Sequence, residues 1–130
     1  MPGLNIFKCY CAFVAVLAAV FLAQPASAHH GWGWASDELS EMTGEIVSVR
    51  LGNPHGELEI QVNGERWTVE VGQPWRNQRA GLVEGLLAEG RTVTVLGNRS
   101  AREGEQRIKA VRVTIEGEHY DLYPGRVPED

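Results

Sequence analysis

A strict alternation of apolar and polar residues runs from Thr43 onward, and it constrains the fold more than any other feature of the chain. Successive side chains of a strand point to opposite faces, so this period of two predicts half-buried β-strands. The apolar positions of the first three predicted strands are Val47, Val49 and Leu51; then Leu58, Ile60 and Val62; then Trp67, Val69 and Val71. Asn63-Gly64 separates the second strand from the third and predicts a tight hairpin, because both residues tolerate the positive φ of a type I′ turn.

The pattern changes after Gly72, where helical spacing replaces alternation. Pro74 suits the first turn of a helix, and the apolar residues that follow are Trp75, Leu82, Val83, Leu86 and Leu87. Because Gly81 and Gly85 weaken a helix, the sequence predicts a short, imperfect one before Gly90. Alternation then returns at Val93 and Val95, at Val111, Val113 and Ile115, and, after a Glu116-Gly117 turn, at Tyr120 and Leu122.

The order of these elements predicts a mainly β fold: three strands in a meander, a helix, then two or three strands. A small OB-like barrel of five or six strands, with the helix between the third and fourth strands closing one end, satisfies this order and leaves no exposed sheet edge. An open α+β sheet with the helix on one face is the alternative. We place the barrel at residues 42–123, after an N-terminal arm at 29–41 and before a loose tail at 124–130.

Residues 1–28 are typical of a cleaved secretory signal peptide. Lys8 is their only charged side chain, a small and apolar run extends from Cys11 to Ala23, and Ala26-Ser27-Ala28 forms a signal-peptidase site. The run is shorter than the roughly 20 residues that a membrane-spanning helix needs, although an uncleaved anchor is the alternative. The sequence therefore predicts export from a bacterial cytoplasm to the periplasm or the medium, with no permanent membrane anchor after cleavage.

Composition excludes several classes of site and partner. Cys9 and Cys11 both lie in the signal segment, so the mature domain has neither disulfides nor thiolate ligands. The chain carries 17 acidic and 12 basic residues, a net charge of −5, and removal of Lys8 makes the domain more acidic still. Nucleic-acid binding depends on Lys and Arg displacing counterions from phosphates, so we expect no nucleic acid as partner.

Several short motifs, taken in their order, resemble a family of small exported bacterial proteins that is classed as a domain of unknown function. The motifs are Ala28-His29-His30, Thr43-Gly44, Asn53-Pro54-His55, Trp67, and the segment from Leu87 through Gly90 to Gly97. They extend over most of the mature chain. The resemblance implies an OB-like barrel outside the cytoplasm, and it implies no particular activity.

Paired histidines follow the predicted cleavage site directly. Cleavage after Ala28 would give His29 a free α-amine beside its own imidazole, and His30 adds a second imidazole. Amine and imidazole nitrogens suit Cu(II), so His29 and His30 are candidate ligands for a transition metal. His55, in the turn Asn53-Pro54-His55-Gly56, is a candidate third ligand. The alternative is that these histidines are structural, with His55 hydrogen-bonded to backbone groups in its turn.

Tryptophans and arginines form a second set of candidate residues. Trp75, Arg76 and Arg79 stand at the start of the predicted helix, where an aromatic ring and two cations suit an anionic glycan. A solvated helix face is the alternative for these three residues. Trp32 and Trp34 are candidates to stack on a sugar ring or, alternatively, to cover an open end of the core.

The sequence contains no recognisable catalytic constellation. A GxSxG elbow, an HExxH helix and a phosphate-binding loop are all absent, and the acidic pair Glu57 and Glu59 falls on the exposed face of a strand. We therefore predict a non-enzymatic exported binding domain that holds a transition metal such as Cu(II) through His29. The alternative is an interaction module for a ligand, glycan or protein of the cell envelope.

Overall fold

Six strands and one short α-helix form the framework of residues 31–129, the part of the chain that the computed structural model describes. In chain order the elements are β1 (Ala35–Arg50), β2 (Glu57–Val62), β3 (Glu65–Glu70), α2 (Pro74–Ala80), the 3-10 turn η1 (Glu84–Leu86), β4 (Thr92–Ser100), β5 (Arg107–Ile115), β6 (Glu118–Asp121) and the 3-10 turn η2 (Pro124–Arg126). The predicted mainly β class, with its helix between the third and fourth strands, is confirmed. Within residues 31–129 no helix is long and apolar enough to cross a bilayer. The predicted signal segment 1–28, together with His29 and His30, lies outside the described residues.

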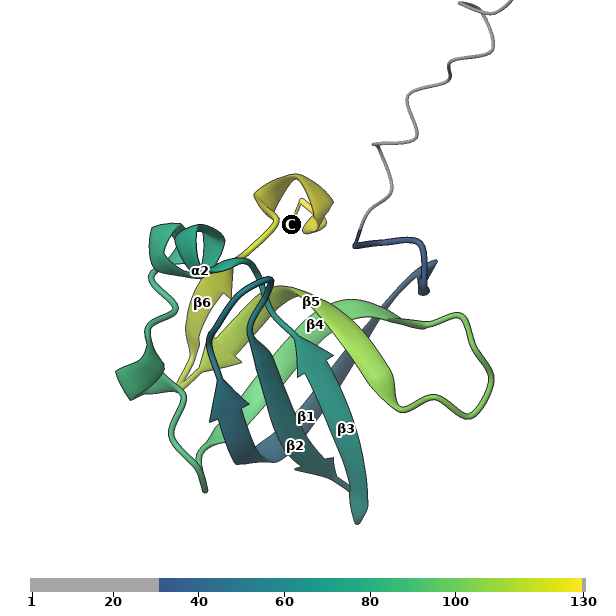
Figure 1. The fold of residues 1–130 in the computed structure, drawn as a ribbon, viewed down its shortest axis with the longest axis horizontal. Helices are drawn as coiled ribbons and strands as arrows, with labels where there is room; N and C mark the ends of the chain where they lie inside the picture. The colour runs from purple at the N-terminus through teal and green to yellow at the C-terminus, as the bar shows by residue number, and fades with distance from the viewer. Residues whose placement is uncertain (1–30, 130) are drawn as a thin grey trace, which may run out of the picture. The chain divides into compact units, whose positions relative to one another are not determined.

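The strands pair in a closed ring (Figure 1). Their hydrogen-bonded order is β3-β2-β1-β4-β5-β6, and a parallel pairing of β3 with β5 joins the two sides of the sheet, with Glu70 opposite Lys109. The ring therefore consists of β1 to β5, and β6 pairs with β5. This arrangement agrees with the predicted closed sheet rather than with the open α+β alternative.

Alternation along the strands produces the core inside the ring. The strand side chains that form this core are Met42, Ile46, Leu58, Ile60, Val69, Val93, Val95, Ile108, Ala110, Val113 and Ile115. Val111, a predicted inward residue of β5, is buried too but lies outside this cluster, because the register of β5 on β4 shifts between Ala110 and Arg112. Trp67, in an inward position of β3, is partly buried against this core, and its ring lies 5.1 Å from Cζ of Arg99. The Asn63-Gly64 turn has φ values of 49° and 85°, and Glu116-Gly117 has 51° and 84°. Both predicted tight turns are confirmed, because type I′ turns have two consecutive positive φ values.

Because of a β-bulge in β1, the residues that point toward the core in the first half of this strand differ from the predicted ones. Ile46 pairs with Ile60 and Ser48 pairs with Glu59, so Val47 has no residue opposite it. An extra residue in one strand shifts the alternation by one position. Ile46 therefore takes the buried position that the sequence pattern gave to Val47, and Val47 is only partly buried.

The helix is shorter than its apolar spacing predicts. Pro74 begins α2, but the helix ends at Ala80, where Gly81 follows with a φ of +81° and donates its N–H to the Gln78 carbonyl. A glycine in this left-handed conformation is a common helix terminator. The remaining apolar residues reach the core without a helix, since Leu82 and Leu87 are buried on either side of η1.

Both ends of the domain contain more regular structure than predicted. The predicted boundary at residue 42 lies inside β1, which begins at Ala35, where Ala35 pairs with Ser100 of β4. The stretch from Ser36 to Glu41 lacks the apolar alternation that marks a strand, so its pairing is visible only in three dimensions. The predicted loose tail at 124–130 begins with η2, in which Arg126 donates its N–H to the Tyr123 carbonyl.

Candidate functional site

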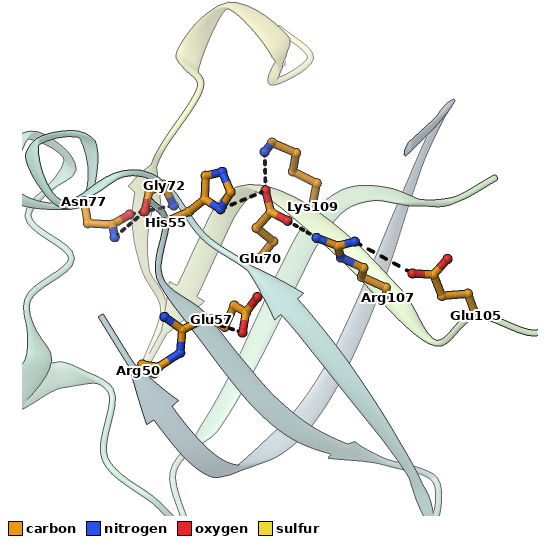
Figure 2. Close-up of polar contacts among 9 residues, drawn as sticks. All are labelled: Arg50, His55, Glu57, Glu70, Gly72, Asn77, Glu105, Arg107 and Lys109. Carbon is orange, nitrogen blue, oxygen red and sulfur yellow. Dashed lines mark hydrogen bonds and ion pairs between the residues drawn. The ribbon is translucent and has the colours of Figure 1, made fainter. Parts of the chain in front are cut away.

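A buried carboxylate stands at the point where β3 and β5 close the ring. Val69 and Ile108 point into the core, so their neighbours Glu70 and Lys109 lie on the outer side of the ring, and yet both are buried, with 0% and 2% of their surface exposed. Oε1 of Glu70 accepts a hydrogen bond of 2.5 Å from Lys109 Nζ, and Oε2 accepts one of 2.5 Å from Arg107 Nη2 (Figure 2). We call Glu70, Arg107 and Lys109 the β3–β5 seam.

His55 adjoins this seam. Its Nδ1 lies 3.7 Å from Glu70 Oε1, and its side chain is about one-third exposed (Figure 2). The loop between β1 and β2 holds it there, because Gly56 donates its N–H to the Gly72 carbonyl at 3.0 Å and accepts one from Val71 at 2.9 Å. The predicted metal ligand therefore faces a carboxylate that two cations already neutralise.

No group of three or more His, Cys, Asp or Glu residues within positions 31–129 is arranged to hold a metal ion. The other two predicted ligands, His29 and His30, fall outside the described residues. His119 is exposed, and its Nδ1 lies 2.8 Å from Thr114 Oγ1.

Two tryptophans lie against the cations of the seam. The Trp34 ring centroid is 3.9 Å from Cζ of Arg107, and the Trp32 ring centroid is 5.0 Å from Nζ of Lys109. Cations are attracted to the negative face of an aromatic ring. These two tryptophans therefore contact the cations of the seam.

The C-terminal turn contributes two further residues to this group. The rings of Tyr123 and Trp32 meet edge to face at 4.9 Å, and Cζ of Arg126 lies 3.9 Å from the Trp32 centroid. Burial raises the pKa of the Tyr123 phenol, against the opposing effect of the Arg76 and Arg126 cations. The phenol is therefore neutral at physiological pH. Sequence reasoning missed Tyr123 and Arg126 because it assigned the end of the chain to a last short strand and a loose tail.

In the predicted cluster on α2, Trp75 is exposed and Arg76, which is partly buried, lies between two rings. Trp75 has 52% of its surface exposed, and Cζ of Arg76 lies 4.5 Å from its ring and 4.2 Å from the ring of Tyr123. Nη1 of Arg76 donates to the Leu122 carbonyl at 3.1 Å, while its buried Nε has no acceptor among the described residues. Arg79 is exposed.

Asn77 fixes α2 against the end of β3. The side chain is buried, and it both accepts from the Gly72 N–H and donates to the Gly72 carbonyl, each at 2.8 Å. A Cβ on Gly72 would come within 2.8 Å of the Asn77 Oδ1, so glycine is required at this contact. This pair of hydrogen bonds sets where Trp75, Arg76 and Arg79 stand.

A pocket of about 230 Å³ lies beside the helix. We call it the α2 pocket, and its lining residues are Arg76, Arg79, Ala80, Asp121, Leu122 and Pro124. Arg112 neutralises the one acid in this lining: its Nε and Nη2 donate to Asp121 at 2.5 and 3.1 Å, and this hydrogen bonding holds the pKa of Asp121 below its ordinary value. Arg76 and Arg79 form no ion pair with any residue in the described part of the chain, so the lining presents their positive charge.

Residues 16–109 match the model of a family described as a family of unknown function, DUF6152. The chain belongs to this family. The DUF6152 match ends at Lys109, so it includes the β3–β5 seam, His55, Trp75, Arg76 and Arg79 and excludes everything after Lys109. The predicted membership of an uncharacterised family is confirmed.

Solved structures with some likeness to this DUF6152 chain are distant. One is the crystal structure of TiaS in complex with a tRNA, AMPCPP and agmatine, at 16% identity and a TM-score of 0.47, where the match covers 60% of this chain and 18% of the other. A ZRD-deleted mutant of TiaS with agmatine matches at 17% identity and a TM-score of 0.45, covering 65% and 26%. The chain thus spans only about a fifth to a quarter of these proteins, and a likeness this weak carries no argument. No curated protein matches the chain.

Proposed function

We propose that this chain is an exported, non-enzymatic domain that binds an anionic ligand, an acidic glycan of the cell envelope, in the α2 pocket. The observation that carries the proposal is the pair of arginines beside an exposed tryptophan at a concave site: Arg76 and Arg79 line the pocket, and Trp75 is 52% exposed. On a chain of net charge −5 this is a local reversal of charge.

The chemistry of these side chains suits a carboxylated sugar. A guanidinium group presents planar donors that match a carboxylate, and the hydrogen bonds are strengthened by the charge. Trp75 offers a flat apolar face on which a sugar ring can stack. The lining supplies no unengaged nucleophile or base, because its single carboxylate, Asp121, is held by Arg112. These features support binding rather than catalysis, and the predicted signal peptide supports a ligand outside the cytoplasm.

Binding in the α2 pocket is tested by titrating the protein with di-galacturonic acid and, separately, with the neutral disaccharide cellobiose. Tryptophan fluorescence reports binding in both titrations. We expect the acidic sugar to bind more tightly, and Arg79→Ala to weaken it about tenfold or more, because a hydrogen bond to a charged group contributes about 1.5–3 kcal/mol. Trp75→Ala should weaken both sugars. Since both side chains are exposed, neither change should affect folding.

Arg102→Ala is the matched control for these titrations, because Arg102 is also exposed but lies in the β4–β5 loop and does not line the pocket. Arg79→Ala and Arg102→Ala each remove one positive charge, so the two variants have the same net charge. Equal affinities of the Arg79→Ala and Arg102→Ala proteins for the acidic disaccharide would show that the pocket is not the binding site.

A Cu(II) site at the mature N-terminus is the second candidate function. One observation favours it: Trp32 lies on Lys109, which binds the same Glu70 oxygen that His55 approaches at 3.7 Å. His29 is three residues before Trp32, and three residues of extended chain span about 10 Å. A chain that begins at His29 would therefore have its terminal amine and imidazole within about 10 Å of Trp32.

Copper binding is tested on the exported protein after N-terminal sequencing establishes that it begins at His29. We expect His29→Ala to weaken Cu(II) binding tenfold or more in a competitive titration, roughly the loss of one strong ligand, and His55→Ala to weaken it less. His119→Ala should leave it unchanged, because His119 is a surface histidine bonded to Thr114. If the His29→Ala and His119→Ala proteins bind copper equally, the terminal site does not exist.

A further inference from the structure

The contacts of the α2 pocket continue onto a longer row of rings and arginines. Arg76 lies between Trp75 and Tyr123, the Tyr123 ring meets the Trp32 ring, and Arg126 lies over Trp32. The successive separations are 4.5, 4.2, 4.9 and 3.9 Å, so no gap interrupts the row. We call these five residues the aromatic–arginine track.

Three segments that are distant in the sequence meet in this track. Trp75 and Arg76 come from α2, Tyr123 and Arg126 from the segment after β6, and Trp32 from the segment before β1. Tyr123 and Arg126 are held at a fixed separation, because the Arg126 N–H donates to the Tyr123 carbonyl at 2.9 Å across η2. The track is therefore built by the tertiary fold.

The arginines of this surface differ from most others in the domain. Arg50, Arg66, Arg91, Arg107 and Arg112 each pair with a carboxylate. Arg76, Arg79 and Arg126, in contrast, form no ion pair with any residue from 31 to 129. In a chain with more acids than bases, unpaired arginines gathered on one connected surface leave their charge for an external anion.

We infer that the ligand is a linear polyanionic glycan that lies along the track, with one acidic sugar in the α2 pocket and another at Arg126. This inference rests on the proposed function of the pocket and adds the length and charge repeat of its ligand. A row of five contacting side chains is longer than a single sugar ring. The exposed ring of Trp75 offers a stacking face at one end, and the guanidinium groups of Arg79 and Arg126 offer separate carboxylate partners.

The inference is tested by the dependence of affinity on ligand length. Di-galacturonic acid and hexa-galacturonic acid are titrated into the exported protein and into its Arg126→Ala, Arg126→Glu and Arg102→Ala variants. In the unmodified protein and the Arg102→Ala control we expect the hexamer to bind about tenfold or more tightly than the dimer. Arg126→Ala should remove most of the preference for the hexamer over the dimer, and Arg126→Glu should reverse this preference. Both variants should bind the dimer with unchanged affinity, because Arg126 does not line the pocket.

The outcomes separate the inference from the function on which it rests. Suppose that the dimer binds through Arg79 but that the Arg126 variants still prefer the hexamer over the dimer as strongly as the unmodified protein does. Binding along the track is then ruled out, while binding in the α2 pocket is supported. If neither sugar binds the unmodified protein, both are overturned. Arg126 is exposed, so its replacement should not affect folding. Circular dichroism of each variant checks that a weaker preference for the hexamer is not caused by unfolding.

Discussion

Replacement of Glu70 by alanine is expected to lower the free energy of unfolding by about 3–5 kcal/mol, the cost of breaking a buried ion pair. Lys109 is only 2% exposed, and its Nζ lies 2.5 Å from Glu70 Oε1. Without the carboxylate, the ammonium group stays out of water with no counter-charge, and Arg107 loses its partner at 2.5 Å as well. Urea denaturation followed by circular dichroism measures the change.

Glu57→Ala is the matched control, because Glu57 stands directly opposite Glu70 in the β2–β3 register. It also pairs with an arginine, Arg50, but at the surface, where the two side chains are 37% and 58% exposed. Exposed pairs contribute about 0–1 kcal/mol. A loss of less than about 1 kcal/mol for Glu70→Ala would contradict the prediction.

A double variant separates buried charge from packing at the same position. Glu70→Leu combined with Lys109→Met removes both charges and keeps apolar volume, and such replacements are often neutral. We therefore expect the double variant to be more stable than Glu70→Ala alone. Should the double variant be the less stable of the two, the seam would be held by packing rather than by charge compensation.

Gly97→Ala is expected to destabilise the domain by about 3 kcal/mol, the upper end of the usual cost of overpacking. A Cβ at Gly97 would lie 2.2 Å from the carbonyl oxygen of Lys109 and 2.8 Å from its carbonyl carbon. These are backbone atoms of the neighbouring strand, where Gly97 pairs with Ala110, so no side chain can rotate away. In the Gly97→Ala protein, β4 and β5 must therefore move apart next to Lys109, a residue of the β3–β5 seam.

Gly85→Ala is the control for the backbone effect of removing a glycine. A Cβ at Gly85 meets no atom within 4 Å, and its φ is not positive, so the change should be neutral or stabilising by less than about 1 kcal/mol. Thermal unfolding of both variants measures the difference. If Gly97→Ala unfolds at the same temperature as Gly85→Ala, the close approach of β4 and β5 is not a constraint on the fold.

Most of the strand framework follows from short-range features of the sequence. Two tight turns, Asn63-Gly64 and Glu116-Gly117, were predicted from residue types alone, because the positive φ of a type I′ turn selects those residues locally. The predicted inward positions of β2 and β4 agree with the buried side chains. Alternation failed at Val47 and at Val111, where bulges in β1 and β5 changed which residues point inward, since a bulge depends on the partner strand as well as on the strand itself.

The candidate site was predictable only where its residues are neighbours in the sequence. Trp75, Arg76 and Arg79 share one short helix, so their proximity follows from the chain itself. Tyr123 and Arg126 gave no such signal, because they meet Arg76 and Trp32 only after the ring has closed. The predicted placement of the metal ligands stays a prediction, since two of the three precede residue 31.

The sequence by itself determined the class of fold, the tight turns and the face of most strands, because hydrophobic periodicity and turn chemistry act over a few residues. It could not determine what covers each face. Alternation assigned Glu70 to the outer side of the ring, where charged residues normally meet water. Only the parallel closure of β3 on β5 made Glu70 and Lys109 neighbours, and only the tertiary fold brought the rings of Trp32 and Trp34 over the cations of the seam, because burial depends on segments far apart in sequence.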